Sequence, residues 1–241
     1  MCKSKRFLML AAMVLAAACV ATFMVGSAVA ADTAAGISVK IGDAEAETVD
    51  SFAAAMEKVK AADADAAKVI TLGEGTVSAA DVNTFRIETP NLTIAGAGVD
   101  KTVINTGDFA ISGQAGVLIA ADNVTVRDLA VVSNNPGASG AAIKVTKIGT
   151  AEELPAVKNV TIANVSVKTI EAGFGLNLHG VEGATVTNVT VESSKKASVS
   201  IASASDCLLY TSECMRGQIP PASIELGASR LSVKGRRFAD K

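Results

Sequence analysis

A segment that starts with a turn residue and continues with alternating apolar and Thr residues recurs along the middle of the chain. It limits the possible folds more than any other feature. The four copies are Asn91–Gly98, Asn123–Val131, Asn159–Val167 and Gly183–Val191, and their starts are 32, 36 and 24 residues apart. A unit of this length, repeated several times, is typical of solenoids, in which each unit buries its apolar face against its neighbours.

The alternation inside each copy indicates strands. In the third copy Val160 and Ile162 belong to one face and Thr161 to the other, and a period of two residues is that of a half-buried strand. A polar residue then separates two short strands within each copy. The sequence therefore predicts an all-β fold, a parallel β-helix over residues 48–206. Further inward strand residues are expected at Ile143, Val145, Leu176, Leu178, Val199 and Ile201.

The polar residue between the two strands is Asp128, Asn164 or Asn188, at equivalent places in three copies. A side-chain oxygen there can accept a hydrogen bond from a backbone N–H that the bend leaves unpaired. Stacked one above another, these residues would form a structural ladder. Asp128 could instead be a catalytic acid, but its equivalence to two asparagines favours the structural role.

A different pattern precedes the repeats. Asp50 and Ser51 can cap a helix whose apolar residues Phe52, Met56 and Val59 follow helical spacing. We expect a short helix at about residues 50–62 that covers the open end of the apolar stack, after a lead-in over residues 31–47.

The first 30 residues are expected to be a signal peptide. A positive start is followed by an apolar run over residues 7–25, and Ala28 and Ala30 occupy the two positions that signal peptidase reads. Cleavage after Ala30 predicts an exported protein, secreted or at the cell surface, with the periplasm as an option and no membrane span after cleavage. A retained membrane anchor and a lipoprotein at Cys19 are the alternatives.

The last segment differs in composition from the rest. Residues 31–206 carry 21 acidic and 13 basic side chains, a net of −8, whereas residues 207–241 carry 3 and 6, a net of +3. Cys207–Ser212 resembles the translation of a transposase mosaic end, and the repeat stops there. We therefore interpret residues 207–241 as a non-native or frame-shifted tail, with a native basic cap as the alternative.

Cysteine and charge exclude several functions. Two of the four cysteines belong to the leader and two, Cys207 and Cys214, to the tail, so residues 31–206 hold no thiol nucleophile and no Cys-ligated metal. The net charge of −2 offers no cationic face for nucleic acid. Aromatic residues are scarce, so a glycan site would depend on hydrogen bonds.

The other candidate residues are expected to have structural roles. His179 is the only histidine and has no evident partner for acid–base chemistry or metal binding, so we expect a solvent-facing turn residue. Arg127 is expected on a solvated strand face, and the Gly96–Gly98 turn is too short for a phosphate cradle. Residues 133–140 form a turn-rich loop, the best place for an adaptable binding surface. We expect no catalytic residue, cofactor or metal site.

Three blocks resemble the opening of pectin-lyase-like right-handed β-helix proteins: Thr48–Phe52, Val69–Thr76 and Asn91–Ile104. The Gly-Ala-Gly-Val-Asp-Lys-Thr-Val-Ile stretch within the last block is similar to pectin methylesterases. The resemblance covers about residues 48–206 and implies a right-handed parallel β-helix with a short N-terminal capping helix.

The same family's catalytic residues do not carry over. Gly140–Lys144 stands where pectin methylesterases have a catalytic Gln, and no Gln-Asp-Thr-like segment follows. The acidic cluster that pectate lyases use for Ca²⁺ cannot be assembled from the isolated Asp108, Asp122 and Asp128.

The sequence therefore predicts a non-catalytic β-helix domain of a bacterial envelope or surface protein, a rigid scaffold for adhesion or glycan contact. Its expected partners are polysaccharide or cell-envelope components. The alternatives are a truncated pectinase-type esterase or lyase, whose catalytic rungs (turns of the β-helix) lie beyond residue 206, and a periplasmic accessory factor.

Overall fold

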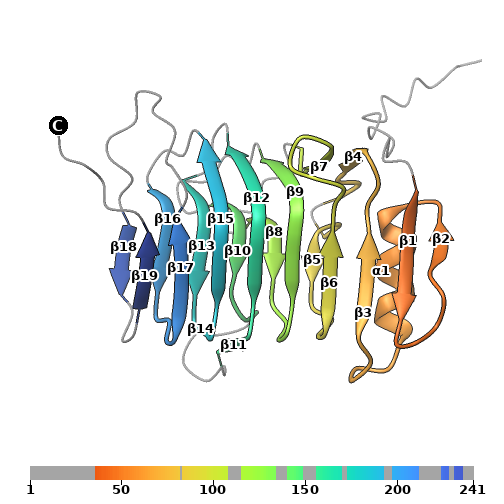
Figure 1. The fold of residues 1–241 in the computed structure, drawn as a ribbon, viewed down its shortest axis with the longest axis horizontal. Coiled ribbons are helices and arrows are strands. Elements are labelled where there is room, and N and C mark those ends of the chain that lie inside the picture. Colours follow the sequence, from red (N-terminus) through yellow and green to blue (C-terminus); the bar gives the residue numbers. More distant parts are fainter. Residues whose placement is uncertain are drawn as a thin grey trace, which may run out of the picture.

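A computed structural model describes residues 36–81, 83–107, 115–133, 140–148, 156–169, 173–192, 197–211, 224–227 and 231–235. The described chain is mostly β, with one helix among its strands. The strands line up side by side along the long axis of the molecule, roughly in chain order (Figure 1).

The elements, in chain order, are β1 (Ile37–Ile41), β2 (Glu47–Val49), α1 (Phe52–Ala61), β3 (Lys68–Thr71), β4 (Gly75–Ser78), β5 (Arg86–Ile87), β6 (Leu92–Ala95), β7 (Thr102–Asn105), β8 (Ala115–Ile119), β9 (Thr125–Ser133) and β10 (Ala141–Val145). They continue with β11 (Val157–Lys158), β12 (Thr161–Thr169), β13 (Phe174–His179), β14 (Val181–Glu182), β15 (Thr185–Glu192), β16 (Ala197–Ala202), β17 (Cys207–Thr211), β18 (Ile224–Gly227) and β19 (Leu231–Gly235).

Two large sheets hold most of these strands. The first follows the order β19-β17-β15-β12-β9-β6-β3-β1-β2, with β4 and β7 attached beside it, and the second follows β18-β16-β13-β10-β8-β5. Neighbouring strands come from successive turns of the chain and pair in parallel, as between β9 and β12 or β10 and β13. Antiparallel pairing occurs between β1 and its two neighbours. The sequence prediction of stacked parallel strands agrees with this pairing.

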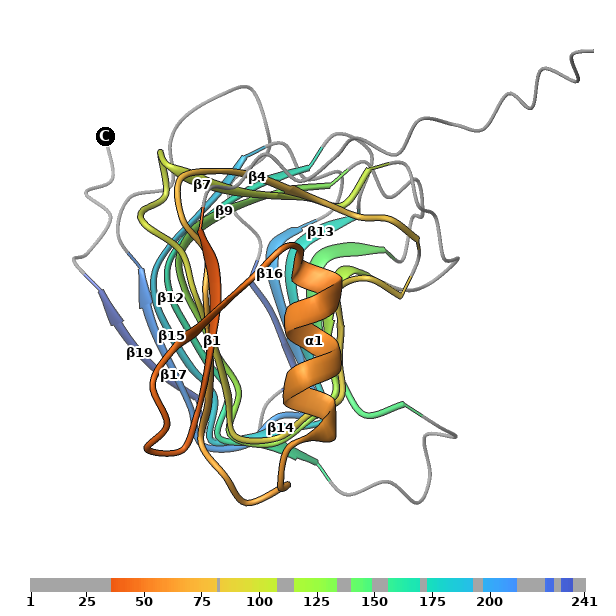
Figure 2. The same cartoon turned by 90° about the vertical axis from the view of Figure 1, so that its right-hand side faces the viewer.

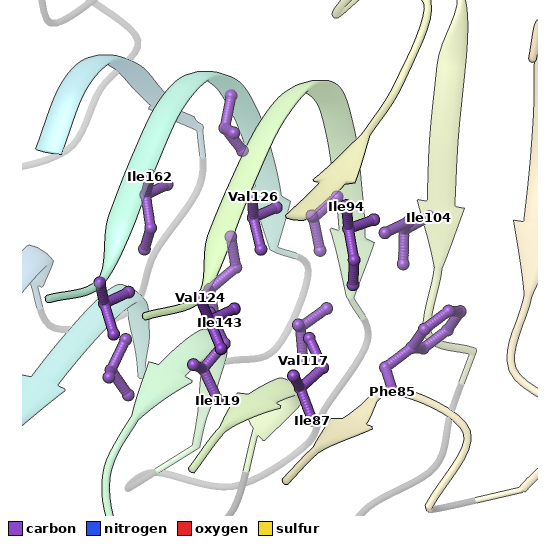
Figure 3. Packing of buried hydrophobic residues seen from close by; sticks show 14 of the residues in the cluster. Phe85, Ile87, Ile94, Ile104, Val117, Ile119, Val124, Val126, Ile143 and Ile162 are labelled. Carbon is purple, nitrogen blue, oxygen red and sulfur yellow. The ribbon is translucent and has the colours of Figure 1, made fainter. Parts of the chain in front are cut away.

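The core lies between the two sheets and runs along the axis. One set of alternating residues on each strand points inward, and Figure 3 shows Ile87, Ile119 and Ile143 in this set, facing Ile94 and Val126 from the other sheet. Of the six further inward residues that the sequence predicts, five are fully buried, and Val199 is partly buried against the same core. Since each rung covers the next, no single rung could bury its apolar face alone.

Helix α1 closes the N-terminal end of the stack. The Ser51 side chain accepts a hydrogen bond from the backbone N–H of Ala54 at 3.1 Å, which caps the first turn. The buried face of α1 carries Phe52, Ala55, Met56 and Val59. Figure 2, viewed along the axis, shows α1 lying across one side of the opening that the sheets surround. The expected helix is therefore present and begins and ends within the expected range.

A buried lysine ties this end to the first rungs. The Lys68 side chain is 1% exposed, and its ammonium donates to the carbonyl oxygens of Ala64, Ala66 and Pro90 at 3.0, 2.8 and 3.2 Å. A buried ammonium is tolerated when its three protons have acceptors. The residues after α1 are thereby fastened to the turn that precedes β6.

Parallel stacking extends past residue 206. Strand β17 pairs with β15, and Cys207 and Leu209 are each 3% exposed within the common core. Strand β18 pairs with β16, and β19 with β17. The interpretation of residues 207–241 as a non-native tail stays a prediction. The expected cleavage site at Ala28 and Ala30 lies outside the described residues. Within the described ranges, no helix is long and apolar enough to cross a membrane.

Candidate functional site

The outward face of five strands of the six-stranded sheet, β5, β8, β10, β13 and β16, carries one residue per strand at a common register. These residues are Arg86, Leu118, Lys144, Asn177 and Ser200, each paired with the next across neighbouring strands. We call them the outer column. Successive members are about 4.8 Å apart because that is the spacing of hydrogen-bonded strands. The outer column is a row of side chains on a rigid support.

Burial changes the chemistry of two members of the outer column. It lowers the pKa of the Lys144 ammonium, since removal from water disfavours the charged form. Asn177 is next in register, and its buried Oδ1 has no hydrogen-bond donor within the described part of the chain. An unpaired buried acceptor costs about 1–3 kcal/mol.

The other three members of the outer column are either paired or buried. Arg86 pairs with Glu88, at 3.2 Å between Nη2 and Oε1. Its charge is therefore compensated by the residue that directly follows β5. Leu118 and Ser200 are each 6% exposed. The polar members between these positions are Lys144 and Asn177, and both are only partly buried.

The three predicted ladder residues lie in successive rungs, joined by side-chain hydrogen bonds. Nδ2 of Asn164 donates to Oδ1 of Asp128 at 2.9 Å, and Nδ2 of Asn188 donates to Oδ1 of Asn164 at 3.0 Å. All three have positive φ, from 51° to 59°. Asn and Asp tolerate this left-handed conformation better than other residues with a side chain, which explains why they stand at the bend within β9, β12 and β15.

Asp128 is held as a carboxylate by this arrangement. The hydrogen bond from Asn164 is the main reason why the pKa of Asp128 is lowered. Burial opposes this effect, and the hydrogen bond and charge of Arg127 lower the pKa further. A carboxyl group that stays ionised near neutral pH is a poor general acid. The contacts support the structural role for Asp128 and give Arg127 a partner on its own strand.

The residue one rung before Asp128 must be glycine. Gly96 donates its backbone N–H to the Arg127 carbonyl at 3.0 Å, and Gly98 donates to the Asp128 carbonyl at 2.9 Å. A Cβ built on Gly96 would lie 2.3 Å from the Asp128 carbonyl oxygen. This close backbone approach explains Gly96 without a ligand, and it ends the ladder at Asp128.

A second ladder escaped the sequence reasoning. Nδ2 of Asn159 donates to Oδ1 of Asn123 at 3.0 Å, Nδ2 of Asn123 donates to Oδ1 of Asn91 at 2.9 Å, and Asn91 donates to the Ala64 carbonyl at 2.9 Å. These asparagines also have positive φ, 55° to 57°. The signal was available, because each of them heads a copy of the repeat.

A small charged cluster adjoins the second ladder. Oδ1 of Asp122 accepts from Nζ of Lys147 and from the backbone N–H of Lys158, both at 3.0 Å. Burial raises the pKa of Asp122, but these hydrogen bonds and the two lysine charges outweigh it, so the net pKa is lowered. Lys158 also pairs with Glu182 at 3.2 Å. Asp122 thus joins the residues on both sides of segment 148–156.

The remaining sequence candidates do not assemble into a site. His179 is exposed at the end of β13, next to the turn at Gly180. Within the predicted loop, Ser133 is buried at the end of β9, while residues 134–139 lie outside the described part, as does Asp108. In the described ranges no three His, Cys, Asp or Glu side chains lie close enough to hold a metal ion.

Comparisons with known proteins identify no family for this chain but do find a similar solved structure. No protein-family model matches the sequence, and no curated protein is similar to it. Among solved structures the chain is similar to the A-module of a mannuronan C-5 epimerase, AlgE6, from Azotobacter vinelandii, with 21% identity and a TM-score of 0.43. The match covers 65% of this chain and 49% of that chain, so this chain spans about half of its length.

Proposed function

We propose that this chain is a right-handed parallel β-helix of the pectin-lyase-like kind. Parallel strands from successive turns of the chain, stacked in both large sheets, support the coil. The right hand follows from the strong general preference of parallel crossover connections. The three sequence blocks that resemble the opening of those proteins, with the capping helix before the first rung, support the family assignment.

The function that this architecture supports best is that of an exported, non-catalytic scaffold that contacts polysaccharide or other cell-envelope components. The outer column carries the proposal, because it sets Lys144 and Asn177 one rung apart on a rigid face, and no described residue donates a hydrogen bond to Oδ1 of Asn177. Hydrogen-bonding groups of this kind suit a polyhydroxyl ligand, and the Lys144 ammonium favours one that bears carboxylates.

The acidic residues nearest to the ladders support a scaffold over an enzyme. Asp128 is engaged by Asn164 and Arg127, and Asp122 by Lys147 and Lys158. Both carboxylates therefore stabilise stacked turns. Export rests on the signal-like sequence before Ala31, and the mass of the N-terminal peptide of the protein recovered outside the cytoplasm would test it, with Ala31 as the expected first residue.

A second candidate is a carbohydrate-active esterase or lyase whose catalytic rungs lie outside this sequence. The lowered pKa of Lys144 favours it, because an amine that is easier to deprotonate can act as a base. In that case the outer column would be part of a substrate site and the bound polysaccharide would be altered.

Polysaccharide binding distinguishes these functions. The protein would be applied to an array of acidic and neutral polysaccharides, together with Lys144→Met, Asn177→Leu and the control Lys168→Met. Lys168 is an exposed lysine on β12, in the other sheet. We expect binding to acidic polysaccharides that falls at least tenfold in the first two variants and persists in the control. A flat array, or equal losses in all three variants, would contradict the proposal, and release of shortened or de-esterified sugar would favour the enzyme.

A further inference from the structure

All Asn-x-Ser/Thr sequences of the chain fall on the two ladders. The chain has ten asparagines, and five of them, Asn91, Asn123, Asn159, Asn164 and Asn188, are followed two residues later by Thr93, Thr125, Thr161, Ser166 and Thr190. This is the acceptor sequence for N-linked glycans in secreted proteins. Among the asparagines in the described ranges, these five acceptors are also the ones with positive φ.

The fold itself accounts for the motif. The turn position requires a residue that tolerates positive φ, for which Asn is suited. Two residues later the chain is in a strand with its side chain on the outward face, as the register Thr93–Thr125–Thr161 shows. Thr is a favourable residue at such a position. Each rung therefore produces an acceptor sequence as a consequence of its turn and its outward strand position.

Folding holds the same residues in the stacked rungs, although side chains such as that of Asn123 stay exposed to solvent. In the middle rung the Asn123 amide both donates and accepts within its ladder. Its backbone N–H donates to the Lys158 carbonyl, and the Thr161 N–H donates to the Val124 carbonyl, both at 2.9 Å. Thr125 is paired on both sides, with Thr93 and Thr161. A glycosyl transferase that must hold the Asn amide and the Thr hydroxyl of one extended segment would have to pull a rung from the stack.

We propose that the five ladder asparagines are latent N-glycan acceptors, open in the unfolded chain and closed by folding. The donor is a lipid-linked oligosaccharide pyrophosphate. A bond forms between Nδ2 and C1 of the first sugar, the bond from C1 to the pyrophosphate oxygen breaks, and the pyrophosphate leaves with the electron pair. One amide proton passes to a base of the transferase. The proposal goes beyond polysaccharide contact, and its test does not depend on export.

The experiment compares a folded and an unfolded acceptor of the same length. The full chain and the variant Leu129→Asp/Val165→Asp, which places two charges in adjacent rungs of the core, both carry a flexible C-terminal acceptor peptide as an internal reference. Each is incubated with a purified transferase and a lipid-linked oligosaccharide, and circular dichroism verifies the two states. Peptide mass spectrometry then measures the modified fraction at each asparagine.

We expect the reference peptide to be modified in both proteins and the ladder asparagines at least tenfold more in the unfolded variant. Adding Thr161→Val to that variant should abolish modification at Asn159 and leave the other four unchanged. Modification of ladder asparagines in the folded chain at the rate of the reference peptide would overturn closure by folding. An unfolded variant modified at the reference peptide but at none of the five would overturn their assignment as acceptors.

Discussion

At the N-terminal end the stack is closed by a helix and an antiparallel trio, β1, β2 and β3, whereas the rungs β9, β12 and β15 pair only in parallel. The end uses large side chains, with the Phe52 ring 5.2 Å from that of Phe85. The rungs β9, β12 and β15 have mainly Val and Ile inside, with Leu129 in β9, and the ladder residues Asp128, Asn164 and Asn188 at the bends. The end must cover apolar surface from one side, while each rung is covered from both.

This difference predicts where the stack is most easily damaged. A rung that loses one contact keeps neighbours above and below, whereas the end has contacts on one side only. In a solenoid, stability is close to a sum of repeat and nearest-neighbour contributions. Loss of the helix therefore exposes the first rung directly, and the ladders contribute smaller increments spread along the axis.

The largest expected effect is at the capped end. Replacement of Phe52, which is 1% exposed, by Ala should cost about 3–5 kcal/mol of unfolding free energy, because it leaves a cavity between helix and first rungs. Urea denaturation followed by circular dichroism measures this loss. The control Lys60→Ala changes an exposed position of the same helix and should stay within about 0.5 kcal/mol of the wild type. Similar losses in both variants would show that the helix is not a cap.

The next effect concerns the strands after residue 206. Leu209 is buried at 3% exposure and the adjacent Leu208 lies on the outward side of β17. If β17 is a native rung, Leu209→Ala should cost about 2–5 kcal/mol and Leu208→Ala much less. Thermal and urea denaturation of both variants decide the point. Equal, negligible losses would support a non-native tail.

Asn164 tests the ladder inside a rung. Asn164→Ala loses two ladder hydrogen bonds and forces alanine into positive φ, so we expect a loss of about 2–4 kcal/mol from the two contributions together. Asn164→Gly loses the same hydrogen bonds but tolerates the backbone conformation, and it should cost less. Urea denaturation of the pair separates the two contributions. If glycine proves as damaging as alanine, backbone conformation is not a reason for Asn at this position.

Gly183 offers a smaller change in the opposite direction. It stands one rung after Asn159, has a φ of 74°, and its N–H donates to the Ser205 carbonyl. Gly183→Asn could extend the second ladder and restrict the unfolded chain, with an expected gain of up to about 1 kcal/mol. A new Cβ would lie 3.0 Å from Oδ1 of Asn159, which is exposed and can shift. A loss of stability in urea would mean that this shift is not tolerated.

The smallest expected effect is on pH dependence. Because the folded state lowers the pKa of Asp128, its contribution to stability is present above the ordinary Asp value of 3.8 and is lost as pH falls through the lowered folded value. Denaturation midpoints measured from pH 7 to pH 2 should therefore fall less steeply in Asp128→Asn than in the wild type. Identical acid slopes would mean that neither Asn164 nor Arg127 favours the ionised form.

The sequence predicted the repeating strands and the capping helix because both leave a local pattern. A period of two with Val and Thr marks the strands, and a cap residue before Phe52, Met56 and Val59 marks the helix. The second ladder was missed although Asn91, Asn123 and Asn159 head the copies. The turn before each copy requires positive φ just as the bend within the copy does.

The sequence predicted only part of the outer column. Lys144, Asn177 and Ser200 each lie between two residues that the sequence places inward, so their outward direction was predictable, but which of them are neighbours depends on strand register. The intervening loops differ in length from rung to rung, so sequence spacing does not give that register. The burial that lowers the pKa of Lys144 likewise comes from what surrounds β10 in space.

By itself the sequence determined which residues face inward and which turn, since alternation and turn propensity are properties of short segments. Only the tertiary structure decided which side chains stack on which and which acceptor oxygens are buried. It also decided the direction of the hydrogen bonds along each ladder, which run from Asn to Asp128 in one and to the Ala64 carbonyl in the other. Those depend on the alignment of segments 24 to 36 residues apart, and only the packed core sets that alignment, because a slip of one residue would turn every apolar side chain outward.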